Sequence, residues 1–112
     1  MPSGAELRKV DYADHSALTE SLRGVDVLIS VFGTSSIGQQ IPLLDAAKAA
    51  GVKIFVPSEF GVATAGLDPS LPVVGSKLKV QEHATKIGLP YTIFWTGLFA
   101  DYVFVPCVWH PL

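Results

Sequence analysis

The chain has 112 residues, of which 49% are hydrophobic and 16% charged, and its formal net charge is −2. A chain of this length forms one domain at most. It lacks the clustered Lys and Arg of a nucleic-acid-binding protein, and it has no apolar run of the ~20 residues that span a bilayer. The high apolar content has two explanations: a sheet buried on both faces, or a piece of a larger domain whose partner surfaces are missing.

The cysteine and histidine residues bear on disulfides, on the cellular compartment and on metal binding. The single cysteine, Cys107, excludes an intramolecular disulfide and fits a reducing compartment, so we expect a cytoplasmic protein. His15, His83 and His110 lack the spacing of zinc ligands, and no metal site is predicted. Residues 1–6 have neither the charged start nor the apolar core of a signal peptide.

The first predicted elements are a weak strand and a short helix. Residues 5–12 read as an edge strand, because Arg8 and Lys9 interrupt its apolar positions and an edge tolerates such charges. Asp14 is expected to cap the helix that follows, since its carboxylate can accept from backbone N–H groups of the first turn. Gly24 is expected to end this helix.

A strand–helix–strand unit follows. Residues 25–31 form the strongest predicted strand, apolar and rich in β-branched side chains. A loop over 32–36 leads to a helix over about 37–50, which Gly51 caps before the next strand at 53–56. The length of the unit suits a right-handed crossover between parallel strands.

The exit from the strand at 53–56 gathers polar and aromatic side chains. Pro57 ends the strand because it has no N–H to donate, and Gly61 is expected to let the backbone turn. Between them, residues 58–60 are Ser, Glu and Phe. Ligands of open α/β sheets bind at this end of the strands. The alternative is an ordinary strand-to-loop exit.

The second half of the chain is predicted as a loop, a helix and a strand. Residues 62–75 show no period and form either a lid over the strand ends or a surface connection. A helix over about 75–86 ends at Gly88. The fourth strand, 91–95, consists of strong β formers.

The last residues are expected to leave the carboxyl end of the fourth strand. This places Phe99 and Tyr102 near the same edge as Phe60. The tail 103–112 shows neither a helical stripe nor a clean alternation. It is either a short strand or sequence joined on where the natural continuation was lost, and the residues do not decide between the two.

In this order of elements the chain resembles the NmrA-like and isoflavone-reductase-like family, the atypical short-chain dehydrogenase/reductases. The stretch Pro-Ser-Glu-Phe-Gly at 57–61 is the most specific match. The matching stretches, which run in the family's order, are 24–30, Gln40, 49–61, Ser76–Lys77, 88–92 and 96–99. Members of the family are much longer than this chain, so the resemblance implies a fragment.

The resemblance implies an α/β fold: a partial Rossmann-type parallel sheet with flanking helices that lacks the first βαβ unit. Residues 1–112 would then form a single incomplete NAD(P)-binding domain. The family's glycine-rich turn, which lets backbone approach a pyrophosphate, has no counterpart here, since Gly4 is alone and precedes a strand. Family topology puts the two missing strands between the first and second strands of this chain, so their absence should uncover apolar surface.

The resemblance also implies NADPH as the cofactor and assigns residues to its cleft. Phe60 and Phe99 would flank the nicotinamide. The residues expected to line the cleft are Ser30, Phe32, Gly33, Pro57, Ser58, Glu59, Phe60 and Phe99.

Lys77 is the candidate catalytic residue. The Tyr-x-x-x-Lys pair of ordinary short-chain dehydrogenases is not present, because Val73 stands four positions before it. Isoflavone-reductase-like members use a lysine at the position that Lys77 matches, for proton transfer or to anchor the substrate. Spacing alone favours the alternative, a solvated lysine at a helix start, beside Lys79.

Three functions remain open at this stage. The parent protein is an NAD(P)H-dependent reductase of a small molecule, or a redox-sensing regulator like NmrA that binds dinucleotide and protein partners without turnover. Alternatively the chain is a truncated product with no activity of its own. We expect no direct nucleic-acid or membrane partner, and the sequence does not name the substrate or the oligomeric state.

Overall fold

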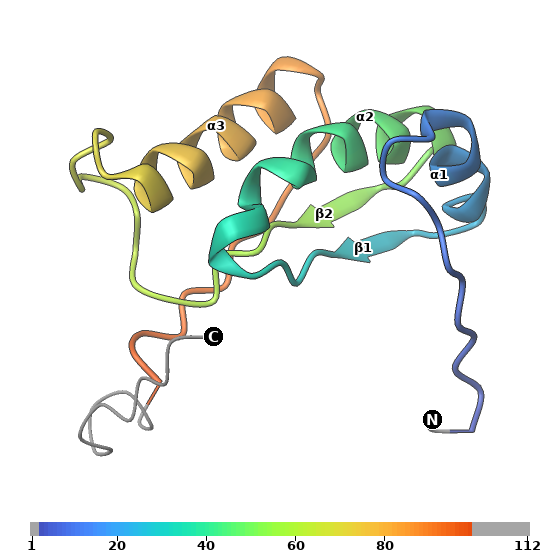
Figure 1. Ribbon diagram of the computed structural model, residues 1–112, viewed down its shortest axis with the longest axis horizontal. Coiled ribbons are helices and arrows are strands. Elements are labelled where there is room, and N and C mark those ends of the chain that lie inside the picture. The colour runs from blue at the N-terminus through green and yellow to red at the C-terminus, as the bar shows by residue number, and fades with distance from the viewer. Residues whose placement is uncertain (1–2, 100–112) are drawn as a thin grey trace.

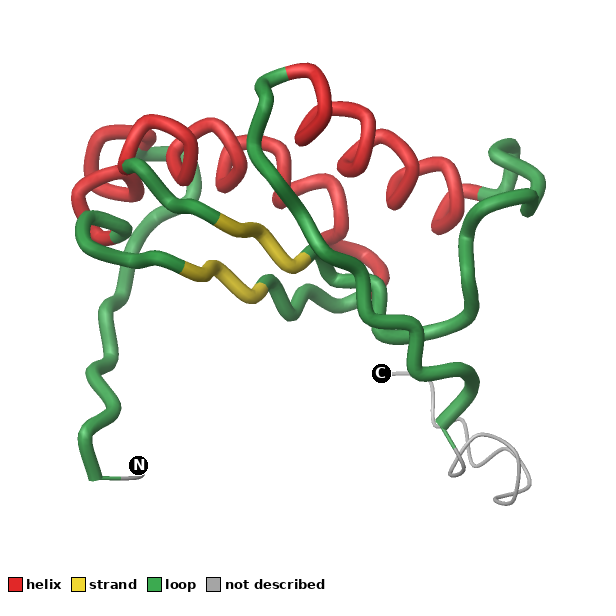
Figure 2. The backbone as a smooth tube through the Cα atoms, turned by 180° about the vertical axis from the view of Figure 1, so that it is seen from behind, coloured by secondary structure: helices red, strands yellow, loops and turns green. Residues whose placement is uncertain are grey.

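The computed structural model describes residues 3–99 (Figure 1). The expectations for Tyr102, the tail 103–112, Cys107 and His110 lie outside these residues. The elements in chain order are α1 (His15–Ser21), β1 (Val27–Ile29), the 3₁₀-helix η1 (Thr34–Gln39), α2 (Gln40–Ala50), β2 (Ile54–Val56) and α3 (Pro72–Lys86). All three α-helices lie on the same side of the two strands (Figures 1 and 2).

The two strands pair in parallel, as the sequence predicts. Val27 lies opposite Ile54, and the register continues to Ile29 opposite Val56. A single parallel bridge joins Phe55 to Tyr91 on the other side of β2. The described part of the chain is therefore an α/β layer in which the strands run in one direction and their carboxyl ends meet at one edge.

Two of the four predicted strands do not form ladders. Residues 5–12 are extended without strand pairing, because no strand lies beside them in the described chain. Residues 91–95 make only the bridge at Tyr91. Their neighbour β2 is three residues long and is followed by Pro57, which has no N–H for a ladder.

The helix ends follow local chemistry. Asp14 caps α1 as predicted: its Oδ1 accepts a hydrogen bond from the Ala17 N–H at 2.9 Å. Gly51 ends α2 in the left-handed conformation at φ +85°, which suits glycine. The loop predicted at 32–36 is instead partly the 3₁₀-helix η1. The third helix begins at Pro72, before the predicted residue 75, since proline is well suited to a first turn.

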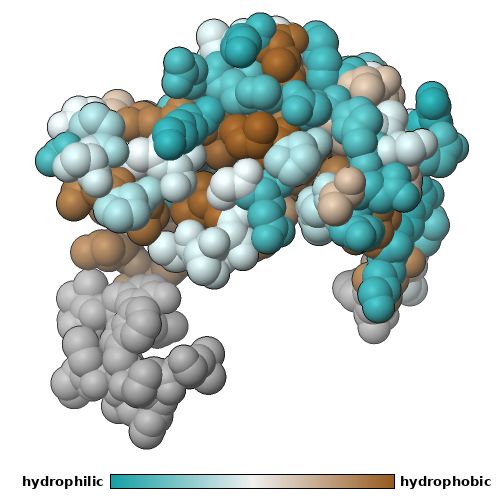
Figure 3. All heavy atoms as spheres, turned by 45° about the horizontal axis from the view of Figure 1, so that its top comes forward, coloured by the Kyte–Doolittle hydropathy of each residue, from teal (hydrophilic) through white to brown (hydrophobic). Residues whose placement is uncertain are grey.

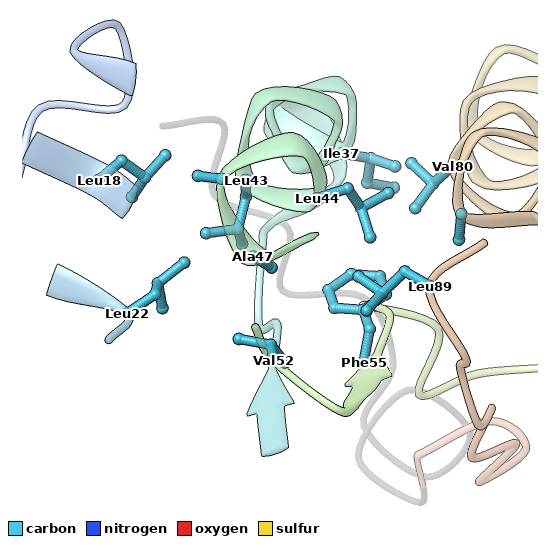
Figure 4. Close-up of a cluster of buried hydrophobic side chains, with 12 residues drawn as sticks. Leu18, Leu22, Ile37, Leu43, Leu44, Ala47, Val52, Phe55, Val80 and Leu89 are labelled. Carbon is cyan, nitrogen blue, oxygen red and sulfur yellow. The ribbon is translucent and has the colours of Figure 1, made fainter. Parts of the chain in front are cut away.

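The hydrophobic core lies between the helices and the inner face of the strands (Figure 4). Leu44 of α2, Phe55 of β2 and Val80 of α3 point toward one another, with Leu89 beside them. Each is almost fully buried, which contributes about 1.5–3 kcal/mol per side chain. This core fixes the two strand ends relative to α3.

The outer face of the strands is apolar and uncovered. Val27, Ile29 and Val31 alternate along β1 and its exit, and all three side chains are largely exposed. The helix side, by contrast, shows mostly hydrophilic and intermediate residues with smaller hydrophobic areas between them (Figure 3). Within residues 3–99, none of the helices is both long and apolar enough to cross a membrane.

Candidate active site

A cleft of about 450 Å³ opens at the carboxyl ends of β1 and β2. Its walls come from the exits of both strands, the start of η1, the first half of α3 and residues 97–99. The lining residues are Val31, Phe32, Gly33, Thr34, Ile37, Ser58, Glu59, Phe60, Gly61, Val73, Lys77, Gly97, Leu98 and Phe99. The volume is that of a typical small-molecule site.

Most of the residues assigned to the site from sequence meet in this cleft. Those that line it are Phe32, Gly33, Ser58, Glu59, Phe60, Lys77 and Phe99. Two others do not line it. Pro57 is buried, and Ser30 faces a different cleft on the other side of β1.

Ser58 ties the exits of the two strands together. Its Oγ accepts a hydrogen bond from the Phe32 N–H at 2.9 Å and donates to the Phe32 carbonyl at 3.0 Å. The backbone N–H of Ser58 donates to Oε1 of Gln40 at 2.8 Å, and Nε2 of Gln40 donates to the Ile37 carbonyl at 3.2 Å. These bonds hold the floor of the cleft in one shape.

Glu59 and Lys77 form a partly buried ion pair at the wall of the cleft. The Lys77 ammonium lies 3.5 Å from Oε2 of Glu59 and donates a 2.8 Å hydrogen bond to the Glu59 backbone carbonyl. The Lys77 side chain is 14% exposed and the Glu59 side chain 1%. Nε2 of Gln81 donates to Oε1 of Glu59 at 2.7 Å and also lies 3.2 Å from Oγ1 of Thr64. Lys77 is therefore held by a partnered group rather than free in solvent.

Phe60 adopts an unusual backbone conformation. Its φ is +31°, and it is the only non-glycine residue with positive φ among residues 3–99. The turn predicted at Gly61 thus bends at Phe60 instead, where an aromatic side chain costs of order 1–3 kcal/mol of strain. The Gly61 carbonyl accepts a hydrogen bond from the Gly97 N–H at 3.0 Å, which brings residues 97–99 to the cleft.

A larger cleft, of about 910 Å³, lies between the extended segment 6–12 and the free edge of β1. Ser30 lines it, and the Ser30 Oγ is buried without a hydrogen-bond partner among the described residues. Lys77 does not line this cleft. Because Lys77, the candidate catalytic residue, lines the smaller cleft, we assign the chemistry to that cleft.

Sequence reasoning gave no role to the residues that support the site. Gln81 holds Glu59, Thr64 holds Gln81, and Gln40, named from the sequence only as a family match, holds Ser58. Gln81 could have been found, because it stands four positions after Lys77 and so shares its face of the helix. Thr64 lies in an irregular loop, where no period indicates which side chains point inward.

The comparisons with known proteins identify the family. The model of the NmrA-like family matches residues 2–106. The chain belongs to the NmrA-like family. It is 38% identical over 104 residues to an isoflavone reductase homolog from Zea mays, covering 89% of this chain and 34% of the relative. It is 34% identical over 112 residues to a phenylcoumaran benzylic ether reductase from Nicotiana tabacum, covering 96% of this chain and 36% of the relative.

Solved structures of family members show the same fold. The structure of AtPrR2 with NADP+ and (+)pinoresinol superposes with a TM-score of 0.80 at 31% identity, covering 88% of this chain and 35% of that one. The ternary complex of leucoanthocyanidin reductase from Vitis vinifera gives a TM-score of 0.75 at 31% identity, with 82% and 33% covered. The chain thus spans about a third of the length of the relatives that it matches.

Proposed function

We propose that the chain is a fragment of an NADPH-dependent reductase that acts on a small aromatic molecule. The observation that carries this proposal is the position of Lys77. Its ammonium lies at the wall of a cleft that Phe60 and Phe99 also line. Support comes from the relatives, whose names describe reductases, and from structures of relatives that contain NADP+ or NADPH.

The residues of the cleft fit the nicotinamide end of the cofactor. An aromatic ring packs well against aromatic side chains, and Gly33 leaves room because no atom lies within 4 Å of where its Cβ would be. Lys77 is the only cation that lines the described cleft, so this part of the chain offers little to bind a pyrophosphate. When bound, NADPH supplies a hydride.

The side chains of the cleft have separate roles in this proposal. Phe60 and Phe99 orient the flat ring and exclude water, which strengthens electrostatic interactions at the site. Lys77 donates a hydrogen bond to the substrate oxygen that gains negative charge as the substrate is reduced. Ser58 keeps the two strand exits in register through its bonds to Phe32.

A fluorescence titration tests the proposal. NADPH is added to the 112-residue chain up to millimolar concentration, and nicotinamide emission is followed. We expect saturable enhancement for the unchanged chain and for Lys79→Ala, since Lys79 is exposed and does not line the cleft. No binding at millimolar NADPH contradicts the proposal.

Turnover separates catalysis from sensing. The rate of NADPH oxidation by a small quinone is compared with the rate without protein. Any excess over the protein-free rate should vanish in Lys77→Ala and persist in Lys79→Ala. Removal of a hydrogen-bond donor to a developing oxyanion lowers the rate by about 10²–10³. Saturable binding without Lys77-dependent oxidation would favour a sensor of dinucleotide over a reductase.

A further inference from the structure

The carboxylate of Glu59 is buried to an extent that needs explanation. Its side chain is only 1% exposed, although the residue lines an open cleft. Burial of an unpaired carboxylate costs several kcal/mol, so such groups are retained where a cation and hydrogen-bond donors surround them. The groups around Glu59 therefore indicate what its charge does.

The two carboxylate oxygens have different surroundings. Oε1 accepts a short hydrogen bond from Gln81, whose amide is held in turn by Oγ1 of Thr64. Oε2 accepts no hydrogen bond from the described residues and lies 3.5 Å from the Lys77 ammonium. Gln81 therefore fixes the plane of the carboxylate, and this orientation turns its remaining oxygen toward the lysine.

The Lys77 ammonium is only partly used by these contacts. It has three N–H donors, of which one is bonded to the Glu59 backbone carbonyl and another faces Oε2. Gly61 packs close to it: a Cβ there would lie 3.4 Å from the Glu59 carbonyl oxygen and 3.9 Å from the Lys77 Nζ, so the absence of a side chain keeps this spot free. The Lys77 side chain lines the cleft and is 14% exposed, so its third donor remains available to a bound molecule.

We propose that Glu59 is a positioning residue that acts through Lys77. Its buried carboxylate, oriented by Gln81, holds the Lys77 ammonium at the wall of the cleft with one donor directed at the bound molecule. This inference rests on the proposed function and adds to that function the kind of substrate group that Lys77 faces. The group opposite Lys77 is an oxygen acceptor that gains negative charge, such as a carbonyl, quinone or phenol oxygen.

The test uses nuclear magnetic resonance of the 112-residue chain with ¹⁵N-labelled lysine. The Lys77 ammonium signal, assigned with Lys77→Arg, should exchange its protons slowly with water. Glu59→Gln keeps the shape of the side chain and removes its charge, and we expect about tenfold faster exchange, as for the loss of one charge-assisted interaction. Glu82 is an exposed residue of α3, the helix that carries Lys77, and Glu82→Gln should leave the Lys77 signal unchanged.

A second readout separates positioning from a purely structural ion pair. Saturating NADPH should shift the Lys77 ammonium signal in the unchanged chain. In Glu59→Gln, NADPH should still bind by fluorescence, but the shift should disappear because Lys77 no longer points into the cleft. An equal shift in Glu59→Gln with binding intact overturns the inference and leaves the proposed function standing. Absence of NADPH binding in the unchanged chain overturns the proposed function instead.

If Glu59→Gln does not fold, a double-mutant cycle replaces it. Stability is measured for Gln81→Met, Lys77→Met and the pair together, because hydrogen-bond and ion-pair contacts connect Gln81 to Lys77 through Glu59. Coupling is expected, with the double variant less destabilised than the sum of the two single variants. Strictly additive changes in stability would show that Gln81, Glu59 and Lys77 are not coupled, and would overturn the inference.

Discussion

The side chain of Ser58 makes two hydrogen bonds to the backbone of Phe32, one as acceptor and one as donor. The two residues are 26 positions apart and stand at the exits of β1 and β2. This reciprocal pair replaces the strand ladder where Pro57 has ended it. The pair therefore sets the distance between the two sides of the cleft.

Ser58→Ala should destabilise the chain and loosen the cleft. Both the N–H and the carbonyl of Phe32 lose their partner, which costs about 1–3 kcal/mol. Urea unfolding measures this change against Ser35→Ala, an exposed serine in η1. A Ser58→Ala variant as stable as Ser35→Ala would show that the two strand exits are held together by other contacts.

Gly75 approaches the preceding loop closely. A Cβ at this position would lie 2.5 Å from the Pro69 carbonyl oxygen, a backbone atom that cannot swing away. Gly→Ala in a helix normally stabilises by roughly 0.5–1 kcal/mol, but a steric clash costs about 1–3 kcal/mol and should outweigh it. We expect Gly75→Ala to lower stability in a denaturant titration.

The matched control is Gly38→Ala, because Gly38 has negative φ and open space around it. This variant should be as stable as the unchanged chain or slightly more so. Equal stability of both alanine variants would contradict the close contact between α3 and residue 69.

Phe55→Ala should be the most damaging single change in the core. Phe55 is fully buried between α2 and α3, and its loss leaves a cavity that costs about 3–5 kcal/mol. Domains of this size have only about 5–15 kcal/mol of stability in total. Phe94→Ala removes the same side chain from an exposed position and should change the thermal midpoint little. Similar midpoints for both variants would show that the core is not where we place it.

Asp68 should make stability depend on pH in acid. The backbone N–H of Ser70 donates to its carboxylate at 2.9 Å, and this bond, with a further one from the Ser70 side chain, lowers the pKa of Asp68. A carboxyl group whose pKa is lower in the folded than in the unfolded state stabilises the fold at pH values above its unfolded-state pKa. This contribution is lost as the pH falls through its folded-state pKa.

Asp68→Asn keeps an oxygen acceptor and removes the titration. The difference in unfolding free energy between this variant and the unchanged chain should be constant near neutral pH and shrink in acid, at pH below the ordinary aspartate pKa of 3.8. Carboxyl ¹³C titration checks the direction independently. A pKa for Asp68 at or above that of an unstructured peptide would contradict the hydrogen bond.

Local features of the fold were predictable from sequence. The Asp14 cap and the left-handed Gly51 depend on chemistry within one turn of the chain, and both predictions are confirmed. The parallel pairing of β1 and β2 followed from apolar runs separated by a helix. The strand at 5–12 was wrong, because strand formation depends on a neighbour that residue patterns in the strand do not reveal.

The candidate site was predictable only in its outline. The prediction that both strands exit at one edge is what placed residues 58–60 beside Phe32 and Gly33, since parallel strands end at a common edge. The contacts that hold them span 18 positions from Gln40 to Ser58 and 22 from Gln81 to Glu59, so local patterns did not indicate the partners, although the spacing from Lys77 places Gln81 on the right helix face. The turn was predicted at Gly61, because glycine turns at the lowest cost, whereas the positive φ falls on Phe60.

Mapping of the NADPH contact surface tests the central claim most directly. Backbone amide signals of the 112-residue chain are recorded with and without the cofactor. We predict that the largest shifts fall on Gly33, Phe60, Gly61 and Gly97 around the smaller cleft, with little change at Arg8 and Arg23 around the larger one. Shifts centred on the larger cleft, or none at saturating NADPH, would contradict the account.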